Sequence, residues 1–165
     1  FLDREHYARF LRVQLRFQTA TAPLYERDDL QQGFPGLLER SRVDLIEADC
    51  RDLGIAEADI EADRAAGRAA CIEGGQAVIG WLYTNEGSNL GAAFLFKRAQ
   101  KELGLSAEFG ARHLAGHPDG RGLHWKRFKA QLNELGLGEA EQEQALGGAR
   151  AAFAFVREAV EAVMA

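Results

Sequence analysis

Two glycines four residues apart, Gly87 and Gly91, lie within the increasingly apolar stretch YTNEGSNLGAAFLF (residues 83–96). A helix turns about 100° per residue, so both glycines would share one face, bordered by Tyr83 on one side and Ser88 on the other. Each interior glycine costs a helix about 1 kcal/mol relative to alanine. The pattern therefore indicates close approach of another surface to bare main chain, either a second helix or a flat ligand.

The spacing alone favours the packing of two helices, because small residues four apart let helix backbones approach closely. Gly80 extends the same face. The charged residues Glu86, Lys97 and Arg98 exclude a membrane-spanning version of this motif. The stretch also contains neither the Gly-Lys-Ser/Thr of a phosphate-binding loop nor the Gly-x-Ser-x-Gly of a nucleophile elbow.

Polar residues interrupt the apolar stripes of two other predicted helices. Gln14, Gln18 and Thr21 continue the stripe of the first helix, and Arg42 does the same in the second. A buried amide without a hydrogen-bond partner costs about 2 kcal/mol or more. Each residue taken singly is explained by bonds to nearby backbone. Together they indicate a polar pocket that holds ordered water.

The histidines could bind a metal, but their spacing favours another role. His113 and His117 are four residues apart, yet Pro118 and neighbouring glycines argue against a helix there. Neither His-Glu-x-x-His nor a cysteine cluster accompanies them. We expect instead a hydrogen-bonded brace across a long loop, formed by Arg112, His113, Asp119, Arg121 and His124.

The elements that must position these residues are helical. Apolar spacings of three and four predict a first helix that is capped by Asp3 and kinked or ended at Pro23. Further helices are predicted over residues 37–53, 76–103, 123–135 and 138–164, with a turn at 33–36, a surface connection containing some helix at 54–74, and an irregular loop at 110–122. The last helix carries one apolar stripe: Leu146, Ala149, Phe153, Val156, Val160 and Val163. With no strand pattern, the fold class is an all-α bundle.

Composition narrows the class of protein. A length of 165 residues suits a single domain, and the net charge of −5 argues against a nucleic-acid partner. No apolar run is long enough to span a bilayer. The two cysteines, Cys50 and Cys71, show no disulfide or Cys-x-x-Cys pattern, which favours a reducing compartment. We expect a cytoplasmic monomer that does not bind membranes.

Several motifs occur in order along the chain: GWLY (80–83), EGSNLGAAFLFK (86–97), GARHL (110–114), HPDGRG (117–122), GAR (148–150) and AFAF (152–155). They resemble the bacterial heme oxygenases that acquire iron from heme. The resemblance extends along essentially the whole chain, residues 1–165, as one domain, and is weakest over residues 54–74.

This resemblance implies a heme-degrading monooxygenase, with heme as both substrate and cofactor. O2 would be used to open the porphyrin at a meso carbon, giving biliverdin, carbon monoxide and free iron. Heme would lie between a proximal helix and a kinked distal helix, the latter bearing Gly87 and Gly91. Electrons would come from an external reductant such as a ferredoxin or a flavin reductase.

The resemblance also implies roles for individual residues. The matched catalytic positions are Gly87, Ser88, Asn89, Gly91, Arg42, Gln14 and Gln18. The last three and Asn89 match a distal polar and water network, in which Gln18 stands where some relatives have histidine. Tyr83 matches a position near a heme propionate and Phe153 an aromatic residue packed on heme, so both are expected to contact heme together with Gly87, Ser88 and Gly91.

One departure concerns the iron ligand. The family's proximal histidine would lie on a helix before Phe1, and no residue here replaces it. The resemblance thus implies a missing N-terminal segment of about 25 to 35 residues. Two alternatives stay open. One is a heme carrier or a degenerate, non-catalytic relative. This alternative would be favoured if the protein truly lacked the helix with the proximal histidine. The other is a helical module whose glycine face docks a partner helix.

Overall fold

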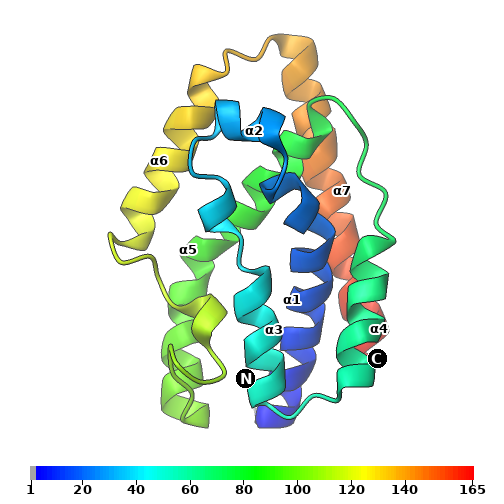
Figure 1. Cartoon of the computed structure of the whole chain (residues 1–165), viewed down its shortest axis with the longest axis vertical. Helices are drawn as coiled ribbons and strands as arrows, with labels where there is room; N and C mark the ends of the chain where they lie inside the picture. The colour runs from blue at the N-terminus through cyan, green and yellow to red at the C-terminus, as the bar shows by residue number, and fades with distance from the viewer. Residues whose placement is uncertain (1–2) are drawn as a thin grey trace.

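The computed structural model describes residues 3–165, and over that range it contains helices and no β-strand. The elements are α1 (Arg4–Tyr25), α2 (Asp28–Gly33), η1 (Leu38–Arg40), α3 (Val43–Asp52), α4 (Glu57–Arg68), α5 (Ala77–Leu103), η2 (Arg112–Leu114), α6 (Arg121–Glu134) and α7 (Glu139–Met164). α1 packs against α3, α4, α5 and α7, whereas α5 packs mainly against α6 and α7 (Figure 1). The predicted all-α class is confirmed.

Local signals explain where the long helices begin and end. The Asp3 carboxylate caps α1 by accepting a hydrogen bond from the His6 backbone N–H at 2.9 Å. The helix passes through Pro23 and ends two residues later at Tyr25. α5 ends at Gly104, whose φ of 67° lies in the left-handed region that glycine adopts most readily.

The structure differs from the prediction in one helix and refines it in one connection. The single helix expected over 37–53 is divided into η1 and α3, because Ser41 is extended (φ −62°, ψ 135°) between them. Residues 54–74 contain more helix than expected, since α4 alone has 12 residues. Its Gly67 lies so close to α1 that a Cβ atom there would be 2.6 Å from the Arg16 carbonyl oxygen.

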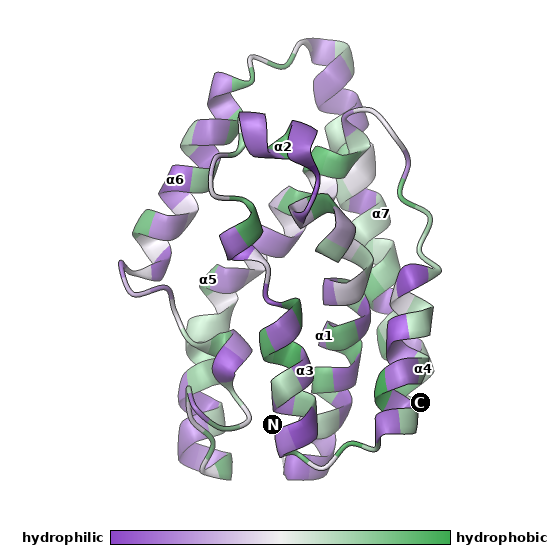
Figure 2. Cartoon of the chain, in the orientation of Figure 1, coloured by the Kyte–Doolittle hydropathy of each residue, from purple (hydrophilic) through white to green (hydrophobic). Residues whose placement is uncertain are grey.

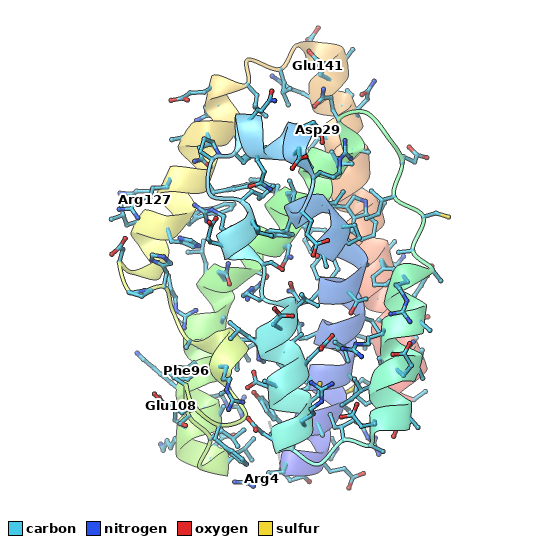
Figure 3. All side chains as sticks on the ribbon, viewed as in Figure 1. Arg4, Asp29, Phe96, Glu108, Arg127 and Glu141 are labelled. Carbon is cyan, nitrogen blue, oxygen red and sulfur yellow. The ribbon has the colours of Figure 1, made fainter. Side chains whose placement is uncertain are left out.

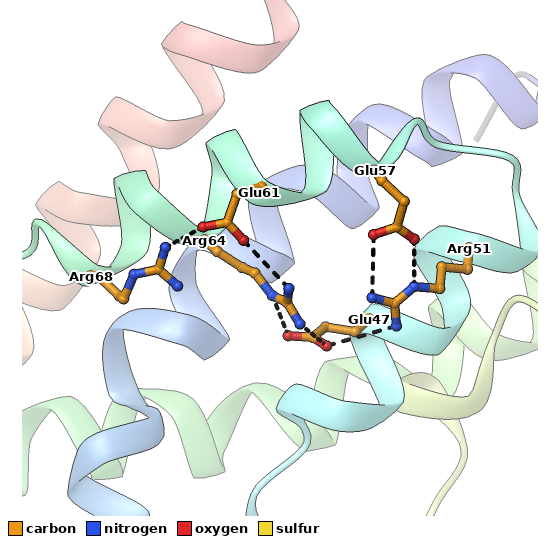
Figure 4. Close-up of polar contacts among 6 residues, drawn as sticks. All are labelled: Glu47, Arg51, Glu57, Glu61, Arg64 and Arg68. Atoms are coloured by element: carbon orange, nitrogen blue, oxygen red, sulfur yellow. Dashed lines mark hydrogen bonds and ion pairs between the residues drawn. The ribbon is translucent and has the colours of Figure 1, made fainter.

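Charged side chains, together with one buried apolar residue, Ile60, hold α4 in place. The buried Asp63 accepts hydrogen bonds from Arg12 and Arg16, with N–O distances of 2.7 and 2.9 Å. On another face of α4, a network of alternating charges joins α3 to α4 and continues along α4 (Figure 4): Glu47, Arg51, Glu57, Glu61, Arg64 and Arg68. Because a helix is recognised in a sequence chiefly by its apolar period, this one is easily missed.

Glycines bring α5 and α7 into direct backbone contact. A Cβ atom at Gly80 would lie 1.9 Å from the Ala145 carbonyl oxygen, and one at Gly148 would lie 1.9 Å from the Ala77 carbonyl oxygen. Any side chain at either position would force the helices apart. Helix packing is therefore the correct interpretation of Gly80.

Two hydrophobic cores lie along α1. One includes Phe17, Leu24, Tyr25, Trp81, Leu82 and Phe128. The other includes Tyr7, Leu11, Leu15, Ile46, Ile60 and Ala92. Four polar residues of α1 and α5 are buried together with these cores: Gln18, Thr21, Asn85 and Glu86. Outside the cores, the short α2 that crosses one end of the bundle is largely hydrophilic (Figure 2).

Candidate functional site

The outward face of α5 carries Gly87 and Gly91. A Cβ atom at Gly91 would meet no described heavy atom within 4 Å, and one at Gly87 would touch only the ring of Trp125, at 3.4 Å. Neither glycine therefore lies against another described backbone, in contrast to Gly80. Helix packing, which the spacing alone favoured, is wrong for these two positions.

Large apolar side chains are exposed around the two glycines. Tyr83, Leu90 and Phe94 are 44, 45 and 65% exposed. At about 100° per residue, these side chains and both glycines fall on one side of α5, and we call this surface the bare face. The helix also changes direction near its middle (Figure 1). Soluble proteins seldom expose a contiguous apolar patch, and such a patch commonly marks a binding site.

α7 adds a second row of exposed apolar side chains. Leu146, Phe153 and Val160, members of the predicted stripe, are 49, 67 and 41% exposed. The buried residues of α7 are small instead, because its close contact with α5 leaves no room for larger ones: Gly148, Ala152 and Ala159. Leu146 and Tyr83 line one cavity of about 410 Å³, which joins the row on α7 to the bare face.

On the side of α5 opposite the bare face, Asn85 organises a buried polar network. Its side-chain amide forms a reciprocal pair with that of Gln18: Gln18 Nε2 donates to Asn85 Oδ1 at 2.9 Å, and Asn85 Nδ2 donates to Gln18 Oε1 at 3.1 Å. Asn85 Nδ2 also donates to Thr21 Oγ1 at 3.1 Å. The polar side chains expected to gather around Gln18 and Thr21 thus lie together and satisfy one another, and the ordered water expected among them stays a prediction.

Arg42 connects this network to the edge of the bare face. Its Nη2 donates to Asn85 Oδ1 at 2.9 Å and to Ser88 Oγ at 3.1 Å. Ser88 Oγ in turn donates to the Asn85 carbonyl oxygen at 2.6 Å. Burial lowers the pKa of Arg42, yet a guanidinium stays protonated in proteins. A fixed positive charge therefore lies next to the Ser88 hydroxyl.

Two predicted site residues lie apart from this network. Gln14 is half-buried on α1 and forms no hydrogen bond to the described network residues. Asn89 lines a cavity on the far side of α5 from Gly87. Its backbone carbonyl oxygen accepts a hydrogen bond from Arg121 Nη1 at 3.0 Å.

Sequence reasoning missed a buried ion pair next to Asn85. Glu86 is 1% exposed, and its carboxylate accepts from Arg40 Nη1 and from the Tyr25 hydroxyl, both at 2.8 Å. Burial and the Glu86 charge raise the pKa of Tyr25 well above its usual value. Helical phase could have found Asn85, since position 85 lies opposite the bare face, but it gives no such signal for Glu86, which borders that face.

The predicted brace across the loop is divided. Asp49 accepts hydrogen bonds from the backbone N–H groups of Arg112 and His113 and lies 2.7 Å from His113 Nδ1. Burial lowers the pKa of His113, so its ring is neutral near pH 7. The other expected members bond elsewhere: Asp119 to Arg127, Arg121 to the carbonyls of Asn89 and Leu114, and His124 by stacking on His117. A single brace is therefore wrong.

Neither a metal cluster nor a membrane span is found in the part of the chain that the structure describes. No three His, Cys, Asp or Glu side chains within residues 3–165 are grouped to hold a metal ion. None of the helices in that range combines the length and the apolar character that crossing a bilayer requires.

Comparison with known proteins explains this arrangement. A family model described as heme oxygenase matches residues 44–162. The chain is 44% identical over 158 residues to heme oxygenase PigA of Pseudomonas aeruginosa, covering 93% of this chain and 75% of the relative. It also superimposes on the NO- and CO-bound heme oxygenase of Neisseria meningitidis with a TM-score of 0.84 and 41% identity, covering 96% of this chain and 76% of that one. The chain therefore has the all-α heme oxygenase fold and belongs to the heme oxygenase family.

Proposed function

We propose that this heme oxygenase binds heme against the bare face of α5 and opens it at a meso carbon, consuming O2 and yielding biliverdin, carbon monoxide and iron. Family membership supports the reaction. The observation that carries the placement is the open space over Gly91, where a Cβ atom would meet nothing within 4 Å. Glycine at that position costs helix stability, and a ligand that approaches the bare main chain offsets this cost.

The residues around the bare face fit a porphyrin. A heme plate is largely apolar, and ligand sites of that kind are lined by aromatic and aliphatic side chains with few polar groups. Tyr83, Leu90 and Phe94 supply such a lining from α5, and Phe153 supplies an aromatic ring from α7. Ser88 is the polar group at the edge. The proposal assigns no axial iron ligand among the described residues.

Bound heme supplies both the iron that activates oxygen and the ring that is oxidised. The protein residues have separate tasks. Gly87 and Gly91 let main chain approach the ligand without intervening side chains. Ser88 Oγ, held between Arg42 and the Asn85 carbonyl, would anchor ordered water and supply a polar, proton-bearing group at the edge of the bare face. Gln18 fixes the Asn85 amide, so Arg42 keeps a constant position.

Other parts of the proposal concern partners. Electrons come from an external ferredoxin or flavin reductase, because the sequence has no nucleotide-binding fingerprint. The enzyme works as a cytoplasmic monomer. Gln14 and Asn89 act through water on the distal side of the heme, since neither bonds directly to Asn85.

The test is to mix the full-length protein with hemin and a reductant in air and to follow the Soret band and the products. We expect the band to decay as a bilin and carbon monoxide form. Gly91→Leu should abolish hemin binding, whereas Gly147→Leu should not. Gly147 is a matched control because it is also helical and exposed, and a Cβ atom there meets nothing within 4 Å.

Other outcomes would reassign the protein. A Soret band that persists with reductant and oxygen, with no bilin, would indicate a carrier. Unchanged hemin binding in Gly91→Leu would show that heme does not use the bare face. Lost self-association or partner association in that variant, with hemin binding intact, would favour a helical docking module.

A further inference from the structure

A cavity of about 290 Å³ lies on the far side of α5 from the bare face. Its walls come from the junction of η1 and α3, from α5 at Asn89, from the loop before α6 and from the first turns of α6. The volume is at the lower end for ligand cavities, which range from roughly 300 to 1,000 Å³. Its chemically active lining is basic: Arg40, Arg42, Arg112, Arg121, His117 and His124.

Two of these arginines are neutralised by acids behind the cavity wall. Arg40 Nη1 lies 2.8 Å from Glu86 Oε1, and both side chains are buried. Arg112 pairs with Asp52 and lies 3.6 Å from a carboxylate oxygen of Asp49. The charges of Arg40 and Arg112 are therefore balanced by these carboxylates, and neither needs an anionic ligand.

The other two arginines have no carboxylate partner among the described residues. Arg42 donates to the side chains of Asn85 and Ser88 and to backbone carbonyls. Arg121 donates only to the backbone carbonyl oxygens of Asn89 and Leu114. A guanidinium does not lose its proton in a protein, and a partly buried charge without a counter-ion is costly. The cavity therefore carries two positive charges that no carboxylate of the described residues bonds directly, although the charge of Glu86, already paired with Arg40, also acts on Arg42.

Other parts of the cavity wall also favour a negatively charged ligand. α6 begins at Arg121 without a side-chain cap, so its first N–H groups and the positive end of its dipole remain available there. His117 and His124 stack with ring centroids 4.3 Å apart. The only carboxylate that lines the cavity within the described residues belongs to the exposed Glu39. Arg127 lies on the outer side of α6, away from the bundle, where it pairs with Asp119 (Figure 3).

We propose that this cavity is a binding site for a small oxyanion, a carboxylate or a phosphate group, held between Arg42 and Arg121. Guanidinium groups match such anions because their N–H groups form paired, charge-assisted hydrogen bonds. Arg42 also donates to Asn85 and Ser88, so the anion shares a cation with the polar network that reaches the edge of the bare face at Ser88. The site goes beyond the heme chemistry and does not depend on it.

The experiment uses the full-length protein without heme. Inorganic phosphate and acetate are titrated in separate arms against sodium chloride at constant ionic strength, and the thermal midpoint and heat of binding are measured. A ligand that binds only the folded state raises the midpoint with a saturable concentration dependence. The two arms show whether the site takes phosphate or carboxylate. In both, we expect more stabilisation than from chloride.

Three variants separate the cavity from general surface charge. Arg121→Gln should weaken oxyanion binding by roughly tenfold or more, because it removes charge-assisted hydrogen bonds. Glu39→Gln should tighten binding, because it removes the carboxylate from the wall. Arg68→Gln should change nothing, since this exposed residue of α4 pairs with Glu61 and does not line the cavity. Glu39→Gln keeps the test valid even if Arg121→Gln unfolds.

His124 provides a local readout. Burial, Arg40 and other nearby cations lower its pKa to about 4. The contributing groups are Arg40, His117, Arg127 and Arg42. A bound anion offsets their charge, so the NMR-detected pKa of His124 should rise with phosphate or acetate. The proposal is overturned if neither oxyanion acts more strongly than chloride, if Arg68→Gln weakens binding as much as Arg121→Gln, or if Glu39→Gln has no effect and the pKa of His124 stays constant.

Discussion

Alanine at two glycines of α5 should have opposite effects on stability, although both share one helix and nearly one face. At Gly91 the new methyl group meets open space, so the helix gains the propensity difference, about 1 kcal/mol of unfolding free energy. At Gly80 the methyl group would lie 1.9 Å from the Ala145 carbonyl oxygen and 2.3 Å from the Ala149 nitrogen. Because both are backbone atoms, the helices must separate.

The size of the Gly80→Ala effect follows from this overlap. Overpacking a tight contact costs about 1 to 3 kcal/mol, and here no flexible side chain can move aside. We take the upper end of that range, about 3 kcal/mol, because the overlap is with fixed backbone; after the helix-propensity gain of about 1 kcal/mol, we expect a net loss of about 2 kcal/mol. For a protein of this size, each kcal/mol shifts the thermal midpoint by about 2 to 4 °C. The two variants should therefore differ by about 6 °C or more.

Urea unfolding of the heme-free protein measures both effects, and hemin titration measures the functional one. Gly91→Ala should raise the unfolding free energy and weaken hemin binding, because its methyl group occupies the space that the ligand needs. Gly147→Ala is the control, expected to stabilise by a similar amount and to leave hemin affinity unchanged. If Gly91→Ala destabilises the heme-free protein, or if Gly80→Ala is harmless, the distinction between the two glycines is wrong.

Three further predictions concern the polar interior. Asn85→Leu should lower the unfolding free energy by about 2 to 4 kcal/mol, because it leaves buried partners unpaired, and a double-mutant cycle with Gln18→Leu should give a coupling of about 1 to 3 kcal/mol. Arg40→Met should cost about 3 to 5 kcal/mol in urea unfolding, because Glu86 would remain buried without its counter-charge. His124 has its pKa lowered to about 4 from 6.5, so between these values the unfolded chain binds more protons and stability decreases as the pH falls. His124→Gln should reduce the slope of unfolding free energy against pH in that range. An unchanged slope in this variant would contradict the assignment of the pH dependence to His124.

The amino-acid sequence by itself determined the long helices and the family. α5 and α7 were predicted to within a residue or so, because caps, glycine ends and apolar period are local properties of the chain. The glycines of the EGSNLG motif and the motifs after it identified the heme oxygenase resemblance, which the comparisons confirm. The presence of polar residues on the α1 stripe was also visible, including Gln18.

Only the tertiary structure decided what each of these residues meets. Gly80 and Gly91 look alike in sequence, yet one touches the backbone of α7 and the other faces open space. Gln18 and Asn85 are 67 positions apart, and only folding makes them partners. Burial, hydrogen-bond partners and the balance of charge in a cavity depend on contacts between distant segments. Helical period carries no information about those contacts, because it records which side of a helix a residue lies on and not what packs against that side.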